Sequence, residues 1–433
     1  MTRISTSLAA LSLALVGATA LAQSAQHDAD AWAEDLNALV EVLETNHPNL
    51  FHTTSQAVWE AQLDAYRTRL PAMSEAERIA GMARLLGMIG DGHTWMPMHP
   101  LPFDGMPPGP GFRSLPVRFE LFDDGLFIVG ATDPDLVGLR VEAFGDIPVA
   151  EALARTLEIL PRDAVNFSRE LAPEWMMQAE LLTALGLAAD AGNIVLTLTD
   201  GETSRVASLQ PLGAQVRYDW AFSMDSGPQT DEDWYTAAAD TPLWQEPMTV
   251  PVRLVTSLEN AAYLQLFSIA NGPERFADLA RQAVALAEPL DEPVLILDLR
   301  RCLGGDGSLN PAFVDELVAS EALSRPGRIR VLTSRQTHSA AIMLLSRLKH
   351  RTGAVRFGQA AADRPNHYGE TNIWVTPNTG LPVIHASEYY ATATPGDTRP
   401  HHAPDITIPY RFDDYAAGID PVLAAALTYN PEI

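Results

Sequence analysis

Regular alternation of strand-like and helix-like segments from residue 250 onward is the strongest constraint on how this chain folds. The strand-like runs are short and apolar, and the helix-like runs between them are amphipathic. The strand-like runs span 262–267, 294–299 and 329–332, and the helix-like runs span 275–287, 311–319 and 339–348. This alternation is typical of an α/β layer with mostly parallel strands. We therefore expect a mixed α/β domain over residues 249–433.

The chain ahead of this domain divides into three regions. Between residues 31 and 90 apolar residues recur at helical spacing, which predicts a helical N-terminal region over 23–105. Two strand-like runs then flank an Asp123-Asp124-Gly125 turn, which predicts a β-rich domain over 106–213. The stretch 214–248 is polar and has no clear period, so we interpret it as a linker or extension.

The first 22 residues have the pattern of a secretory signal peptide. Arg3 is followed by an apolar run from Leu8 to Leu21, and Ala20-Leu21-Ala22 offers a small-residue cleavage site. The alternative is a membrane anchor, but that run is shorter than the roughly 18 to 20 residues that span a bilayer. We expect an exported protein, periplasmic or secreted, that begins near Gln23 and has no membrane span in its mature form.

Charge and cysteine content exclude several classes of function. The 55 acidic and 29 basic residues give a formal net charge of −26, which repels phosphate backbones and anionic membranes. We therefore expect no nucleic-acid partner. Cys302 is the only cysteine, so an internal disulfide and a cysteine-rich zinc site are excluded. No activating base stands near Cys302 in the sequence, and no cofactor is expected.

Ser339 lies where a strand-like run changes into a helix-like one. At the first turn of a helix a serine is close to unpaired backbone N–H groups, which favour an alkoxide and an oxyanion. The same position is also typical of an ordinary N-cap, and both readings stay open. Gly304 and Gly305 follow a buried strand, so their N–H groups can complete an oxyanion hole with that of Ala340, or form a plain turn.

A serine nucleophile needs a base, usually lysine or histidine. Lys349, the only lysine, lies ten residues beyond Ser339 on one predicted helix, about 15 Å along its axis, so it cannot serve. His93 is on a glycine-rich break after a helical run, where a side chain faces a cleft or simply lies at the surface. His338 is adjacent to the serine and points elsewhere.

The other histidines give no strong metal pattern. His401 and His402, with Asp405 or His385, could be combined into a metal site, but adjacent histidines of a strand face opposite sides. His47 and His367 are loop histidines without a local partner. We therefore expect no metal site.

Four segments resemble the tail-specific protease family, also called C-terminal processing peptidases, and in particular its tricorn-like branch. They are residues 298–305, 337–341, 403–409 and 89–94. The resemblance implies a crotonase-like ββα-spiral catalytic domain, an N-terminal helical region and a small PDZ-like domain at 106–213. It implies a serine-type endopeptidase that cleaves peptide or unfolded protein substrates at unstructured chain ends.

The same resemblance assigns roles to particular residues. Ser339 matches the nucleophile and His93 the base, and Asp397 lies close to the place of the acidic third member. The residue before the histidine is usually serine, whereas here it is Gly92. In the branch with a Ser-Lys dyad the lysine would fall near Asp363, and it is missing.

The sequence is also compatible with two other functions. A family member without turnover would act as a peptide- or ligand-binding scaffold. A lipase-like esterase is also an acyl-transfer enzyme, but the chain has no Gly-x-Ser-x-Gly motif. The oligomeric state does not follow from the sequence.

Overall fold

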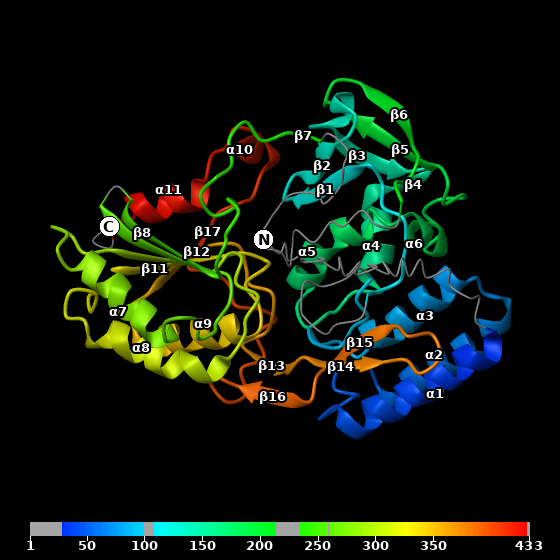
Figure 1. The fold of residues 1–433 in the computed structure, drawn as a ribbon, viewed down its shortest axis with the longest axis horizontal. Helices are drawn as coiled ribbons and strands as arrows, with labels where there is room; N and C mark the ends of the chain where they lie inside the picture. Colours follow the sequence, from blue (N-terminus) through cyan, green and yellow to red (C-terminus); the bar gives the residue numbers. More distant parts are fainter. Residues whose placement is uncertain (1–27, 99–107, 214–233, 259, 431–433) are drawn as a thin grey trace, which may run out of the picture.

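The computed structural model describes residues 28–98, 108–213, 234–258 and 260–430, and it has the mixed α/β architecture that the sequence predicts (Figure 1). The expected signal peptide, 1–22, and residues 214–233 of the expected linker lie outside the described residues. Within the described ranges, no helix combines the length and the apolar character needed to cross a membrane.

A six-stranded sheet forms the C-terminal part, in the order β17-β12-β11-β10-β9-β8. The strands from β9 to β17 are parallel, and only the edge strand β8 runs antiparallel to its neighbour. In chain order they are β8 (Val252–Leu258), β9 (Ala261–Leu266), β10 (Leu295–Asp298), β11 (Ile329–Thr333), β12 (Val355–Gly358) and β17 (Ile406–Thr407). The strand and helix alternation predicted from residue 250 onward is confirmed.

Helices cover both faces of this sheet (Figure 1). One face packs on α7 (Phe276–Ala287), α8 (Asn310–Ala319) and α9 (Ala340–Arg351), and the other packs on α11 (Pro421–Thr428). The two-residue period of the strands explains this, because Leu297 of β10 belongs to the first core and its neighbour Ile296 to the second. A sheet buried on both faces accounts for the uninterrupted apolar runs in the sequence.

The β-rich region is an antiparallel sheet in the order β1-β2-β3-β5-β6, with β4 paired to β3 and β7 to β2. The strands are β1 (Val117–Phe122), β2 (Gly125–Ala131), β3 (Arg140–Phe144), β4 (Ile147–Pro148), β5 (Ile194–Thr199), β6 (Ser204–Leu209) and β7 (Tyr235–Thr236). β7 falls in the stretch interpreted as a linker. That part of the stretch is therefore an edge of the sheet.

Three helices lie in the same region, and only the first was predicted; the first two pack on the sheet and the third packs on α3 (Glu75–Gly87). They are α4 (Val149–Leu157), α5 (Val165–Trp175) and α6 (Ala179–Ala184). The signal for α5 is weak because Pro173 lies inside it, and α6 is short. Almost all of α5 is nevertheless buried, so tertiary packing rather than local propensity stabilises it.

The N-terminal region contains α1 (Ala29–Asn46), α2 (Gln56–Arg69) and α3 (Glu75–Gly87). Ser74 starts α3 with a capping box, because its hydroxyl accepts the N–H of Glu77 while that carboxylate accepts the Ser74 N–H. These helices share one hydrophobic core with the β-rich sheet.

Two late hairpins connect the C-terminal sheet to the N-terminal helices. They form between β12 and β17 and pair β13 (Asn366–Gly369) with β16 (Glu388–Ala391), and β14 (Asn372–Val375) with β15 (Pro382–His385). The second hairpin lies beside α1 to α3 in Figure 1. There Trp95 and Ile384 exchange two backbone hydrogen bonds of 3.0 and 2.9 Å. The segment that carries His93 is thereby held against the C-terminal part of the chain.

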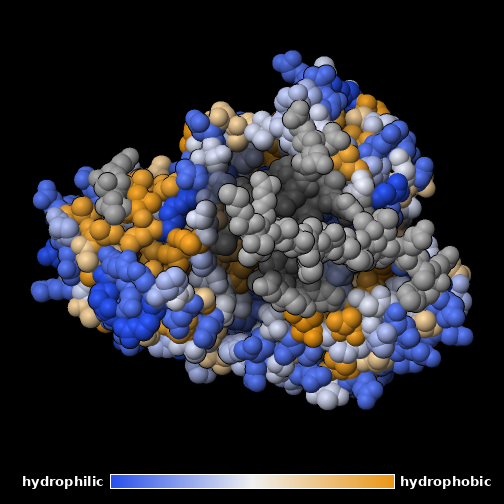
Figure 2. Space-filling view, viewed as in Figure 1, coloured by the Kyte–Doolittle hydropathy of each residue, from blue (hydrophilic) through white to orange (hydrophobic). Residues whose placement is uncertain are grey.

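The outer surface of the molecule is mostly hydrophilic. Figure 2 shows hydrophilic side chains over most of the outer flanks, with a hydrophobic area on the side of β8 and α11. α10 (Phe412–Ala416) packs with Phe122 on the β-rich sheet and adds a further contact between the two parts.

Candidate active site

Ser339 has an unusual backbone conformation at the start of α9. Its φ of 55° and ψ of −122° place a non-glycine residue in a sparsely populated region, which stores backbone strain. Although it occupies the N-cap position, its side chain makes no capping hydrogen bond. The ordinary N-cap interpretation therefore fails. The sharp strand-to-helix turn presents the hydroxyl in the way that a nucleophile elbow does, without the glycine-flanked sequence motif.

The hydroxyl of Ser339 meets the imidazole of His93. Nε2 of His93 is 3.0 Å from Oγ of Ser339, although 246 residues separate the two in sequence. The serine is partly exposed and the histidine is buried. The distance matches the reach of a general base that takes a proton from a nucleophile.

His93 is held neutral by its surroundings. Burial first, and then the neighbouring His338 and His367, lower its pKa to about 3, while Asp363 and Asp91 oppose the shift. A neutral ring has one nitrogen free to accept a proton. With Nε2 facing the hydroxyl, the proton of the base form is on Nδ1.

A chain of hydrogen bonds fixes the loop that carries His93. The backbone N–H of His93 donates to Oδ1 of Asp91 at 2.8 Å, and Nε2 of His47 donates to Oδ2 of the same carboxylate at 2.9 Å. The donor role of His47 follows from its other nitrogen, which accepts the N–H of Asn49 at 3.1 Å. His47 caps the end of α1, so the first helix positions the imidazole.

Asp363 lies close to the imidazole of His93 and was not predicted as a site residue. It is fully buried, and its Oδ2 accepts the backbone N–H of Ser339 at 2.8 Å. Burial alone would raise the pKa of this carboxyl, but His338, His367 and His93 together hold it below its usual value. Asp363 is therefore an ionised carboxylate next to the proposed base.

His338 completes this group of side chains. Its ring stacks on His93 with centroids 4.5 Å apart and on Phe167 with centroids 4.2 Å apart. Its Nε2 is 3.3 Å from Oδ2 of Asp363. The sequence argument that His338 points away from the serine does not exclude it from the site, because it packs on the other imidazole.

The structure does not bring Asp397 to His93. The carboxylate of Asp397 is bound to the guanidinium and the backbone N–H of Arg399, with a shortest distance of 2.6 Å. This pairing lowers the pKa of Asp397 to about 2. The position carried over from the family resemblance is thus occupied by a local ion pair.

Of the predicted oxyanion residues, Gly304 and Ala340 lie directly against Ser339, whereas Gly305 lies against Ile269. A Cβ on Gly304, whose φ is 108°, would lie 2.6 Å from Cβ of Ser339 and 2.9 Å from the nitrogen of Ala340. Ala340 is the first residue of α9, so its N–H has no acceptor within the helix. Gly305 forms a parallel bridge with Ile269, in which its neighbours Gly304 and Asp306 make the hydrogen bonds. The N–H of Gly305 itself therefore points away from Ile269.

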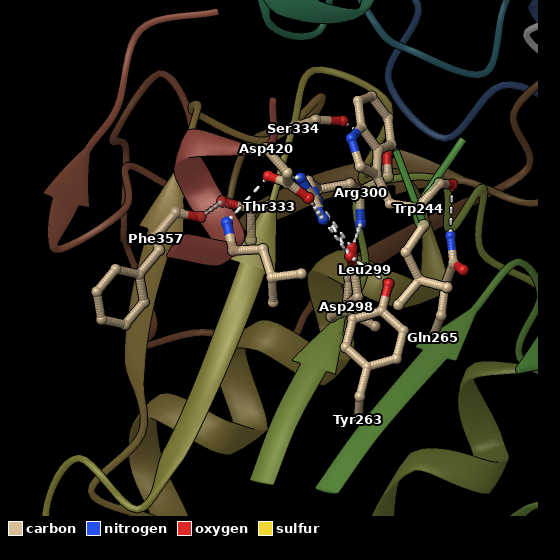
Figure 3. Close-up of polar contacts among 12 residues, drawn as sticks. Trp244, Tyr263, Gln265, Asp298, Leu299, Arg300, Thr333, Ser334, Phe357 and Asp420 are labelled. Carbon is tan, nitrogen blue, oxygen red and sulfur yellow. Dashed lines mark hydrogen bonds and ion pairs between the residues drawn. The ribbon is translucent and has the colours of Figure 1, made fainter. Parts of the chain in front are cut away.

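The loop after β10 is anchored by a buried ion-pair group (Figure 3). Arg300 binds Asp298 at 2.6 Å and Asp420 at 2.8 Å, and its guanidinium lies 4.6 Å from the ring centroid of Trp244. The hydroxyl of Ser334 donates to the carbonyl of Arg300 at 2.6 Å. Residues 298–300 (Asp-Leu-Arg) therefore hold in place the segment that leads to Gly304.

Steric crowding requires glycine at position 92. A Cβ there would lie 2.5 Å from Oδ1 of Asp363 and 3.3 Å from Nε2 of His338. Its φ is outside the left-handed region, so conformation does not demand glycine. The Asp363 carboxylate lies where a side chain at residue 92 would begin, which explains why a serine does not fit here.

Three other sequence candidates contribute no side chain to this group. Burial raises the pKa of the Cys302 thiol to about 12, so it is not a nucleophile. Lys349 is exposed near the end of α9, as its distance from the serine required. His402 is hydrogen-bonded to Ser346 at 2.9 Å.

Comparison with solved structures finds a likeness to CPAF. Mature CPAF complexed with lactacystin superimposes with a TM-score of 0.59 over 90% of this chain and 95% of that chain, at 13% sequence identity. A CPAF mutant gives 0.56 over 94% and 99%, also at 13% identity. The photosystem II D1 C-terminal processing protease gives 0.38 over 90% and 98%, at 13%. The chain thus has the fold of CPAF.

Sequence comparisons give no assignment: no family model matches the chain, and no curated protein matches it.

Proposed function

We propose that this protein is a serine-type peptidase in which Ser339 is the nucleophile and His93 the general base. The observation that carries the proposal is the 3.0 Å contact between the hydroxyl and Nε2 of the imidazole. It is supported by the strained backbone of the serine and by its missing capping bond, since neither serves a purely structural role. The fold shared with CPAF is consistent with this assignment.

In this mechanism the chemistry is acyl transfer. His93 takes the proton from the Ser339 hydroxyl as the oxygen attacks the scissile carbonyl, and it returns that proton to the leaving amine. Water then hydrolyses the acyl-enzyme by the same route in reverse. The N–H groups of Ala340 and of Gly305 or Gly304 stabilise the oxyanion of each tetrahedral intermediate.

We propose Asp363, in place of Asp397, as the carboxylate that supports the imidazole. Nδ1 of His93 and Oδ1 of Asp363 are both buried and have no hydrogen-bond partner within the described structure. A small movement that joins them would satisfy both atoms and fix the proton on Nδ1. Such contacts are often long in unliganded enzymes and shorten in the reactive complex. The negative charge would then stabilise the imidazolium that forms during attack.

The domain organisation and the cellular location are further parts of the proposal. The α/β part, 249–433, is the crotonase-like catalytic domain, and the antiparallel sheet within 106–213 is the PDZ-like domain. The substrate is a peptide or an unfolded protein. The leader at 1–22 directs the protein to the periplasm or outside the cell, and N-terminal sequencing of the exported protein would test the cleavage after Ala22.

Labelling by a fluorophosphonate probe and cleavage of an unstructured protein test the proposal together. Ser339→Ala should abolish labelling and lower turnover by about 10⁴- to 10⁶-fold, and His93→Gln should lower turnover by a similar factor. Ser324→Ala is the matched control, because that hydroxyl is exposed and only bonds the carbonyl of Glu321.

Peptide binding that is retained in Ser339→Ala, with no cleavage by the wild-type protein, would instead identify a peptide-binding scaffold. Equal labelling of the wild type and Ser339→Ala would reject this nucleophile.

A further inference from the structure

Three buried atoms around the imidazole lack hydrogen-bond partners in the described part of the chain. They are Nδ1 of His93, Nε2 of His338 and Oδ1 of Asp363. The exposed fractions of the three residues are 3%, 8% and 0%. One ring nitrogen of each histidine and one carboxylate oxygen of Asp363 lie within 4.8 Å of one another. Buried polar atoms without partners in a native site call for an explanation such as an ion.

The contacts of His338 indicate which of its ring nitrogens carries a proton. Its Nδ1 is 3.4 Å from the carbonyl of Leu303, which is an acceptor, so Nδ1 carries the proton. Nε2 faces Oδ2 of Asp363, 3.3 Å away. Without a proton on Nε2, both atoms would be hydrogen-bond acceptors. Two electron-rich atoms at this distance require a cation, either a proton on Nε2 or a bound metal ion.

We propose that His93, His338 and Asp363 bind a divalent transition-metal ion such as Zn²⁺, and that this ion inhibits the enzyme. The inhibitory part rests on the proposed peptidase function, whereas the binding part does not. Two imidazoles and a carboxylate are a common zinc ligand set with an open fourth position. The bond from His338 to the Leu303 carbonyl is the outer contact that orients metal-binding histidines.

Binding needs only a local adjustment. Ligand atoms in a tetrahedral zinc site with bonds of about 2.0 Å stand roughly 3.3 Å apart. Nε2 of His338 and Oδ2 of Asp363 already have this separation, and the other pairs of ligand atoms, up to 4.8 Å apart, move closer on binding. The His93 and His338 rings are stacked at an angle of 21° and must turn toward each other. Ser339 is partly exposed, so the group is reached from solvent beside the hydroxyl.

The metal and the reaction compete for one imidazole. A metal ion on Nδ1 of His93 moves the ring proton to Nε2, which then donates to the Ser339 hydroxyl instead of accepting from it. The ring can no longer act as a base. Zinc therefore inhibits by changing the tautomer, without blocking substrate binding.

A second group, formed by His47, His52 and Asp91, has possible ligand atoms at similar distances from one another. Its His47, however, carries a proton on the nitrogen that faces Asp91. Nδ1 of His47 accepts a backbone N–H, so Nε2 carries the proton that it donates to Asp91. A nitrogen that carries a proton is no ligand. This contrast points the inference to the group around Asp363.

Titration calorimetry with Zn²⁺ and the visible bands of bound Co²⁺ test the metal site without any activity assay. The wild type and Ser339→Ala should bind equally. Asp363→Asn and His338→Gln should each weaken binding by about 10- to 100-fold or more. His350→Gln removes an exposed histidine and is the control for surface binding. The inference is overturned if the wild type does not bind, if the two ligand variants bind like the wild type, or if only His350→Gln weakens binding.

Inhibition is measured separately as peptide cleavage with added Zn²⁺, reversed by EDTA, and should change kcat rather than KM. Cleavage unaffected by zinc, with no metal bound, would identify His338 as a protonated partner of Asp363 and leave the peptidase proposal intact. Metal bound by a protein that cleaves nothing would support the site and reject the peptidase function.

Discussion

Replacing Asp363 by Asn should lower kcat far more than replacing Asp397 by Asn. The first change removes a negative charge that faces the imidazole while keeping an oxygen that can accept the Ser339 N–H. The second change removes a charge that is already paired with Arg399. The pair of variants therefore separates the carboxylate that the geometry selects from the one that the family resemblance selects.

The size of the effect follows from Coulomb's law. The ligand atoms of Asp363 and His93 are at most 4.8 Å apart. With an effective dielectric constant of about 20, the carboxylate stabilises the imidazolium of the transition state by about 3.5 kcal/mol. This corresponds to a loss of about 300-fold in kcat, with little change in KM. Asp397→Asn should stay within about twofold of the wild type.

Steady-state cleavage of an unstructured protein, with EDTA present, measures both variants, and thermal unfolding confirms that each is folded. A loss below about threefold for Asp363→Asn would refute the electrostatic argument, as would an Asp397→Asn loss that matches it.

Three further predictions concern the same site. Gly304→Ala should cost about 100-fold or more in kcat and suppress probe labelling, because the new Cβ would lie 2.6 Å from that of Ser339; normal labelling would contradict the placement of the loop. Gly92→Ala should lower the free energy of unfolding by about 1–3 kcal/mol, measured by denaturant titration, while Gly111→Ala, which meets open space, should not; equal effects would contradict the steric reason. The acid limb of kcat/KM should lie well below pH 6.5, with activity retained at pH 5, because the lowered pKa of His93 extends the range in which the base is neutral; a limb between pH 6 and 7 would contradict it.

The parts of the fold with strong local signals could be predicted from the sequence. The buried strands and the amphipathic helices after residue 250 have different spacings of apolar residues. Ser74, with Glu77 three residues later, is typical of the start of a helix. α5 could not be predicted in this way, because Pro173 and its polar residues weaken the helical pattern and burial against β1 supplies the stability.

The site was only partly predictable. Ser339 and His93 were named from a helix start and a glycine-rich break, but their contact depends on the hairpin that joins Ile384 to Trp95. Asp363 carried no sequence signal of its own, since a lone aspartate in a loop is common. Two indirect hints were available. The family resemblance places the lysine of the Ser-Lys branch near Asp363, and the missing side chain of Gly92 leaves room for that carboxylate.

Mass-spectrometric identification of the residue that a fluorophosphonate modifies tests the central claim most directly. The account predicts that Ser339 alone is modified in the wild type and that His93→Gln slows the modification by several orders of magnitude. Modification of another residue, or an unchanged rate in His93→Gln, would contradict it.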